Sequence, residues 1–175
     1  MTSVRFSIRT ATLADADPVS RVLLASYQPL LNGHYDDALL ARALPLVTRA
    51  NPRLLSSKQY YVAESEEGRC IGCGGWTRER PSTGDAIDGV GHIRHFATAA
   101  EWSGLGVGKA LLSHSIRSAE KQGVFVLECL ATRNAEGFYM AAGFRRIGPI
   151  DVSLGDGVAL PSLLMRREAS RAGSG

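Results

Sequence analysis

The chain lacks any run of 18 consecutive apolar residues. A run of about that length is needed to cross a bilayer, so we expect no membrane span. The chain also lacks a strong excess of one charge, since 20 Lys and Arg stand against 17 Asp and Glu. A nucleic-acid-binding protein typically carries a dense basic stripe. The first ten residues, MTSVRFSIRT, lack the apolar core of a signal peptide. We therefore expect a protein that binds neither membranes nor nucleic acid.

Cysteine is scarce, with three residues in the whole chain. Three are too few for a disulfide framework. Cys70 and Cys73 have the CxxC spacing, but they stand in the apolar run CIGCGGW, which is typical of a strand. Zinc would need two further ligands at matching spacing, and the sequence offers no such pair. We expect buried, reduced thiols and a cytoplasmic protein, with redox or metal use of the pair as the alternative.

What is present is an ordinary globular composition, with 45% apolar and 21% charged residues in 175. That length suits one domain, which we expect over residues 1–168. The last residues, 169–175, are small and polar and predict a flexible tail.

Periodicity and turn residues predict strands alternating with helices. A layered α/β or α+β sheet follows from this order. Thr12 is the expected cap of the first helix, with Asp15 as its acidic partner. Residues 28–35 are expected to be a loop, and Pro45 predicts a kink or break. The expected strands are 4–9, 58–64, 69–77, 90–98, 124–130, 144–154 and 158–166, and the expected helices are 12–26, 36–49, 107–122 and 134–142.

A glycine-rich turn lies between a predicted strand that ends at Thr98 and a predicted helix that begins near Val107. Its glycines stand at alternating positions: Gly104, Gly106 and Gly108. Glycine lets a ligand approach the backbone, and the free amides at a helix start attract anions. Lys109 would add a positive charge. The turn therefore predicts a phosphate or pyrophosphate site.

Two common phosphate motifs do not match this turn. The dinucleotide pattern G-x-G-x-x-G would need its third glycine at Lys109. The pattern G-x-x-x-x-G-K-[ST] would need a glycine at Ser103 and a hydroxyl at Ala110. A turn that binds no ligand is the remaining structural alternative.

The string GLGVGKALL with the preceding IRHFAT resembles the first motif of the GNAT acyltransferase superfamily, Arg/Gln-x-x-Gly-x-Gly/Ala. A second stretch, residues 134–144, resembles a second motif of that family: Asn134, then Phe138-Tyr139, then Gly143-Phe144. The sequence departs from the family at Ser103, which replaces the usual Arg or Gln, and at Ala100, where proline is common. The order of predicted elements is similar to the family over nearly the whole chain.

The resemblance implies a mixed, mostly antiparallel sheet of about seven strands, with helices on both faces and splayed central strands. It implies an N-acetyltransferase that moves an acetyl group from acetyl-CoA to a primary amine of a small molecule or peptide, by direct attack. The partners would be acetyl-CoA and the amine acceptor. A homodimer is compatible with it, since many relatives dimerise. The alternative is an acyl-CoA-binding module without catalysis.

By the same resemblance, one set of residues holds the coenzyme and Tyr139 protonates the leaving thiolate. The implied coenzyme-binding residues are Phe96, Ala97, Thr98, Gly104, Leu105, Gly106, Val107, Gly108, Lys109, Asn134 and Tyr139.

The attacking amine must lose a proton to a base, directly or through water. The position of the family's glutamate corresponds here to His92, which would share a strand face with Arg94 and Phe96, while His95 faces the other way. Glu128, inside the apolar run VFVLECL, is the rival base, and Glu64 is a weaker third.

Two further hypotheses concern the acceptor side. Cys129 is conceivable as a nucleophile, although no histidine is near it in sequence. The acceptor pocket has aromatic and cationic candidates, which could suit an acidic or aromatic amine: Tyr27, His34, Tyr35, Trp76 and Arg78.

Overall fold

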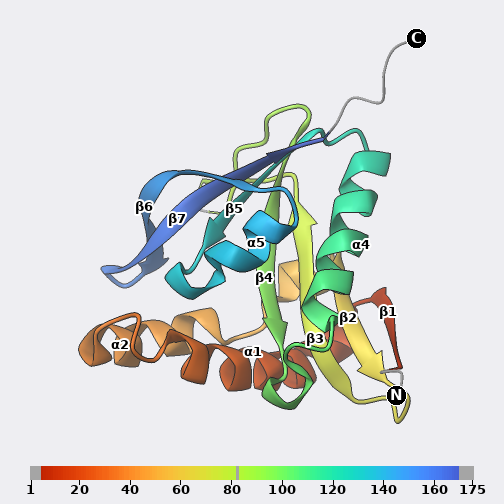
Figure 1. Cartoon of the computed structure of the whole chain (residues 1–175), viewed down its shortest axis with the longest axis horizontal. Helices are drawn as coiled ribbons and strands as arrows, with labels where there is room; N and C mark the ends of the chain where they lie inside the picture. The colour runs from red at the N-terminus through yellow and green to blue at the C-terminus, as the bar shows by residue number, and fades with distance from the viewer. Residues whose placement is uncertain (1–4, 82, 170–175) are drawn as a thin grey trace.

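A computed structural model describes residues 5–81 and 83–169. It contains one seven-stranded sheet in the order β1-β2-β3-β4-β5-β7-β6 (Figure 1). The strands are β1 (Phe6–Thr10), β2 (Tyr60–Ser65), β3 (Cys70–Thr77), β4 (Val90–Thr98), β5 (Val126–Ala131), β6 (Arg145–Gly155) and β7 (Val158–Glu168). The helices are α1 (Ala16–Leu31), α2 (Asp37–Val47), α3 (Pro52–Leu55), α4 (Val107–Lys121) and α5 (Glu136–Ala141), with short 3₁₀ turns at Leu13–Asp15, Ala100–Trp102 and Arg133–Ala135.

The sheet confirms the expected fold class. All neighbouring strands run antiparallel except β4 and β5, which are parallel. These two pair only over Val90 to His92 and Val126 to Glu128. Beyond that point they separate, so the sheet opens into a wedge at its centre. The splayed central strands that the resemblance implied are therefore present.

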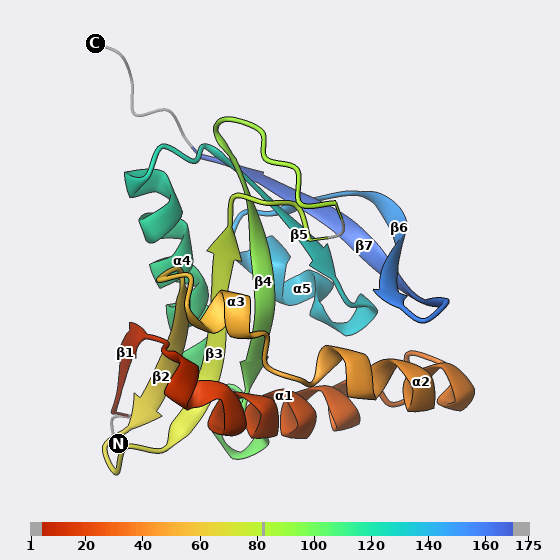
Figure 2. The ribbon, with the colours of Figure 1, turned by 180° about the vertical axis from the view of Figure 1, so that it is seen from behind.

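Helices cover both faces of the sheet. Helices α4 and α5 lie on the face seen in Figure 1, and α1, α2 and α3 lie on the face seen in Figure 2. One buried cluster packs α4 and α5 against the sheet, with Trp76, Leu111 and Met165 at its centre. A second cluster joins α1 to β2 and β3 through Leu23 and Val62. These two layers hold β4 and β5 between them.

The N-terminal helices differ in part from the prediction. Asp15 accepts a hydrogen bond from the Thr12 backbone N–H at 2.8 Å, as expected. The helix that follows ends at Leu31 and not near Ser26, so residues 28–31 are helical and not loop. Pro29 lies inside its last turn, where it removes one backbone N–H donor. The single-turn helix α3 was not predicted.

The second helix matches its prediction closely. Asp36 caps it, with its carboxylate accepting from the N–H groups of Ala38 and Leu39. Pro45 stands near its C-terminal end, and the helix ends two residues later at Val47. The proline therefore coincides with the end of the helix.

Strand β4 contains a bulge that the sequence did not reveal. Cys73 pairs with Ala97, but Gly75 pairs with Arg94, so β4 has one extra residue between them. His95 there has φ 48°. The extra residue shifts the alternation, and the Phe96 ring covers Gly74 on the α4 face, away from the face of His92. The prediction that Phe96 shares a face with His92 and Arg94 is wrong for this reason.

In residues 5–81 and 83–169, no helix is long and apolar enough to span a membrane. Ala169 still donates its N–H to the Phe125 carbonyl at 2.7 Å. The rest of the predicted tail, residues 170–175, lies outside the described residues, as do residues 1–4 of the N-terminal segment.

Candidate active site

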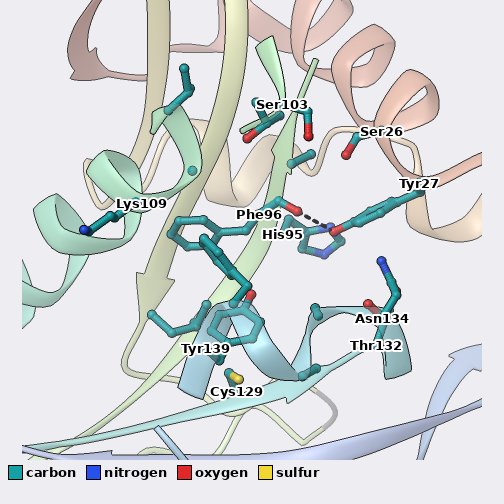
Figure 3. Close-up of a pocket in the computed structure, with 18 of the residues that line it drawn as sticks. Ser26, Tyr27, His95, Phe96, Ser103, Lys109, Cys129, Thr132, Asn134 and Tyr139 are labelled. Atoms are coloured by element: carbon teal, nitrogen blue, oxygen red, sulfur yellow. Dashed lines mark hydrogen bonds between the residues drawn. The ribbon is translucent and has the colours of Figure 1, made fainter. Parts of the chain in front are cut away.

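A cavity of about 450 Å³ occupies the wedge between β4 and β5 (Figure 3). Its wall is built from four parts of the chain. These are the end of α1, the outer half of β4 with the turn before α4, the end of β5, and the 3₁₀ turn with α5. The separation of two strands therefore creates a cleft that runs from the centre of the sheet to the start of α4.

The glycine-rich turn forms one end of this cavity. Gly104 and Gly106 have φ of 76° and 88°, a region that glycine adopts without strain. Gly106 is the N-cap of α4, so the first amides of that helix are free of helical partners. Lys109 lines the cavity nearby. The turn thus combines free N–H groups, the positive end of a helix dipole and a cationic side chain, which together suit an anion.

The outer half of β4 forms a second wall. His95 to Thr98 all line the cavity. The Tyr27 hydroxyl donates to the Phe96 carbonyl at 3.0 Å, and the Tyr60 hydroxyl donates to the His95 carbonyl at 2.8 Å. These two bonds fix the bulged segment against α1 and β2. A strand edge held in this way can pair with an extended ligand.

The wall opposite is aromatic and contains an unpaired acceptor. Tyr139 is 7% exposed and packs between Phe138 and Phe144, with ring centroids 5.0 and 5.5 Å away. Burial raises the pKa of the Tyr139 hydroxyl, so this group keeps its proton at neutral pH. The Oδ1 atom of Asn134 is buried without a hydrogen-bond partner in the described structure. An acceptor of this kind suits an N–H donor brought by a ligand.

Cys129 also lines the cavity, from the end of β5. Its side chain is buried, and desolvation raises the pKa of the thiol. The thiolate is the nucleophilic form of cysteine, so this environment disfavours attack by Cys129. Cys70, Cys73 and Cys129 are all free thiols. No group of three or more His, Cys, Asp or Glu side chains in the described residues could hold a metal ion.

The cavity brings together most of the residues predicted to bind the coenzyme. It is lined by Phe96, Ala97, Thr98, Gly104, Gly106, Val107, Gly108, Lys109, Asn134 and Tyr139. Leu105 belongs to the same turn, but its side chain is 46% exposed and does not line the cavity.

The three candidate bases lie outside the cavity lining. His92 and Glu128 are direct neighbours at the last paired position of β4 and β5, where the wedge closes. Burial lowers the pKa of His92, so its ring is neutral at pH 7. Glu128 accepts a hydrogen bond from Arg166 at 3.3 Å. Glu64 is part of an ion-pair network with Arg9, remote from the cavity.

His95 is a lining residue that the sequence reasoning assigned to the far face. The bulge turns its side chain into the cavity. Burial and the nearby Arg94 lower the pKa of His95 to about 4, so its neutral ring is a weak base. The sequence carries one signal of the bulge that the predicted regular strand overlooked: in HIRHF the polar residues Arg94 and His95 stand side by side and break the alternation.

The residues predicted to line the acceptor pocket lie in different places, and only some of them face the cavity. Tyr27 lines the cavity. Trp76 is fully buried and donates to Ser118 of α4, so it does not face the cavity. The Arg78 guanidinium lies over the Trp76 ring, 5.7 Å from its centroid. The Tyr35 hydroxyl donates to the Pro161 carbonyl and accepts from the Arg133 N–H.

The sequence matches the family model described as acetyltransferase (GNAT) domain over residues 56–146. No curated protein matches the chain. Among solved structures, a PaiA N-acetyltransferase from Thermoplasma acidophilum in complex with coenzyme A aligns with TM-score 0.70 and 17% identity, over 94% of this chain and 99% of that one. A GCN5-related N-acetyltransferase from Rhodopseudomonas palustris aligns with TM-score 0.73 and 20% identity, over 96% and 98%.

A third similar structure covers less of its own chain. It is the N-acetylglutamate synthase from Neisseria gonorrhoeae complexed with coenzyme A and L-arginine. It aligns with TM-score 0.62 and 20% identity, over 96% of this chain and 34% of that one. At these identities, the three structures show a shared fold.

Proposed function

The chain belongs to the GNAT acetyltransferase family, and on that premise we propose that it transfers an acetyl group from acetyl-CoA to a primary amine of a small molecule or peptide. One observation carries the proposal. The cavity between β4 and β5 begins at a turn suited to a pyrophosphate and ends where the two strands pair. A long ligand with an anionic part at one end and a reactive group at the other fits that shape.

We infer the position of the coenzyme from the chemical groups on the cavity walls. Amides from Leu105 to Lys109 hold the pyrophosphate, with Gly106 leaving room for it. The pantetheine arm lies along Phe96 to Thr98 like an added strand. Asn134 receives an N–H of the arm at its unpaired Oδ1. Two structures of the same fold are complexes with coenzyme A, which supports binding of the coenzyme by this chain.

The transfer proceeds by direct attack. The amine nitrogen forms a bond to the thioester carbonyl carbon, and the carbon–sulfur bond breaks. The amine proton passes to neutral His92, directly or through water, and the Tyr139 hydroxyl gives its proton to the leaving thiolate. Glu128 is the alternative acceptor of the amine proton. The raised pKa of the Cys129 thiol argues against an acyl-enzyme. Three free cysteines suit a reducing compartment, so we place this reaction in the cytoplasm.

The test measures both binding and turnover. Isothermal titration should give saturable binding of acetyl-CoA, and release of free thiol with a panel of primary amines should identify at least one acceptor. Tight acetyl-CoA binding without thiol release for any amine would favour a non-catalytic binding module. Absence of binding to acetyl-CoA would refute the proposal itself.

A further inference from the structure

A row of polar side chains crosses the sheet on the face away from α4. Thr77, His92, Glu128 and Arg166 are direct neighbours on β3, β4, β5 and β7. Residues paired directly across a sheet share a face. On each strand, a residue next to the polar one points to the opposite face, into the core under α4. These residues are Trp76, Ile93, Leu127 and Met165. Four strands thus place one polar stripe at the closed end of the wedge.

Arg94 lies on the same face, two residues beyond His92 along β4. Its side chain is half-buried, and burial lowers its pKa. The guanidinium donates one hydrogen bond, to the Thr77 hydroxyl at 3.2 Å. In the described chain, no carboxylate is within ion-pair distance of it, although Glu79 in the loop before β4 is close enough to influence its pKa. Most of its five donors are therefore free.

The other half-buried arginines all have compensating partners. A desolvated cation is costly unless a negative group offsets the lost hydration. Arg78 donates to the Gln122 carbonyl at the C-terminal end of α4, at 2.6 Å. Three others form ion pairs: Arg9 with Asp15 and Glu64, Arg166 with Glu128, and Arg167 with Glu120. Among the half-buried arginines described, Arg78 and Arg94 lack a carboxylate partner; Arg78 has the carbonyl at the helix end, and Arg94 has only a neutral hydroxyl.

Arg94 is next to a residue that lines the closed end of the cavity. Ile93 and Cys129, the first residues past the paired ends of β4 and β5, line the cavity from the other face. Arg94 follows Ile93 directly. In Figure 2 this face of β4 and β5 is turned to the viewer, with α1 and α3 beside it and no described helix over the paired ends. His92 is buried and Arg94 is half-buried, so a molecule approaching the end of the cavity from this face meets the Arg94 side chain first, with His92 two residues along the strand.

We propose, on the basis of the proposed acetyl transfer, that the acceptor is an amine bearing a carboxylate, and that Arg94 binds that carboxylate. The planar guanidinium fork matches a carboxylate with two parallel hydrogen bonds. His92 and Arg94 are two positions apart on one strand, which separates their backbones by about 6.7 Å. The amine of such an acceptor therefore lies beside His92 and the thioester while its carboxylate remains on Arg94. Arg94 is a specificity-determining residue in this arrangement.

The test compares amino acids with their carboxamides, which keep the amine and lose the charge. The wild type, Arg94→Gln and Arg94→Lys are assayed for thiol release with both series. Arg78→Gln is the matched control, since it removes another half-buried arginine that follows Thr77 but donates to the Gln122 carbonyl at the end of α4. A charge-assisted pair contributes about 1.5–3 kcal/mol. The wild type should prefer the best amino acid over its amide by about 10–100-fold in kcat/KM.

In Arg94→Gln the ratio of kcat/KM for the amino acid to kcat/KM for its amide should fall to about one, mainly because KM for the amino acid rises. Arg94→Lys should retain part of the preference, and Arg78→Gln should retain all of it. An unchanged coenzyme affinity in Arg94→Gln would show that the variant is folded. Equal use of acids and amides by the wild type, or a preference that survives in Arg94→Gln, would overturn the inference.

A binding measurement separates this inference from the proposed function. If no amine of either series releases thiol, the transfer reaction is refuted. Thermal stabilisation of the CoA-saturated protein by amino acids is then compared with stabilisation by their amides. Stabilisation that depends on the carboxylate and is lost in Arg94→Gln would still support an anion site at Arg94. Equal or absent stabilisation by the two series would overturn it.

Discussion

Gly106 offers a sharp test of the anion site, because a second glycine at the other end of α4 serves as its control. Gly106 has φ 88° and precedes the helix, while Gly123 has φ 82° and follows it. A Cβ added to either meets no heavy atom within 4 Å. Alanine at both positions therefore introduces backbone strain without a packing clash.

The two substitutions should cost the same stability. A non-glycine residue in this left-handed region costs about 1–2 kcal/mol. For a domain of this size, that corresponds to a decrease in Tm of about 2–8 °C. Thermal denaturation should show this decrease for both Gly106→Ala and Gly123→Ala.

Only the first substitution should weaken coenzyme binding. Gly106 lines the cavity, and relaxing the strain there rotates the peptides that present amides to the pyrophosphate. Loss of one charge-assisted hydrogen bond, about 1.5–3 kcal/mol, raises the Kd for CoA about 10–100-fold. Titration calorimetry should show this increase for Gly106→Ala and wild-type affinity for Gly123→Ala. Equal affinities in the two variants would refute the placement of the pyrophosphate on this turn.

Three further predictions address the acid, the base and the packing of β4. Tyr139→Phe should lower kcat by about 10²–10⁴-fold while leaving the Kd for CoA unchanged, and stopped-flow thiol release should show it; an unaffected kcat would exclude Tyr139 as the acid. Because the pKa of His92 is below its usual 6.5, kcat/KM should be flat at neutral pH and fall in acid as His92 gains a proton. In His92→Gln, kcat/KM should no longer fall in acid in this way. If the fall persists in the variant, another group is responsible for it. Gly74→Ala should destabilise by about 1–3 kcal/mol in urea unfolding, since its Cβ would lie 2.6 Å from the Phe96 ring; a stability equal to wild type would show that the ring moves freely.

The local sequence was sufficient where the determinants are local. The glycine-rich turn and the helix after it follow from residues within a few positions of one another, because glycine conformation and helix capping depend on near neighbours. The Thr12–Asp15 pair formed as predicted for the same reason. The central position of β5 followed from its apolar run. The family resemblance supplied the mixed, mostly antiparallel sheet and its splayed central strands, which periodicity alone leaves open.

The tertiary structure decided what depends on distant partners. The bulge at His95 moves Phe96 over Gly74 and turns His95 into the cavity, and the pairing of β3 with β4 fixes its position. The absence of a carboxylate partner for Arg94 in the described residues also depends on the tertiary structure. The sequence shows an arginine in a strand, but ion pairing depends on distances in space. Only the fold shows that Arg9, Arg166 and Arg167 have carboxylate partners while Arg94 has a neutral hydroxyl. The sequence by itself thus determined the glycine-rich turn and the helix that follows it, because their determinants are local, while the packed sheet decided which arginine remains without a carboxylate partner.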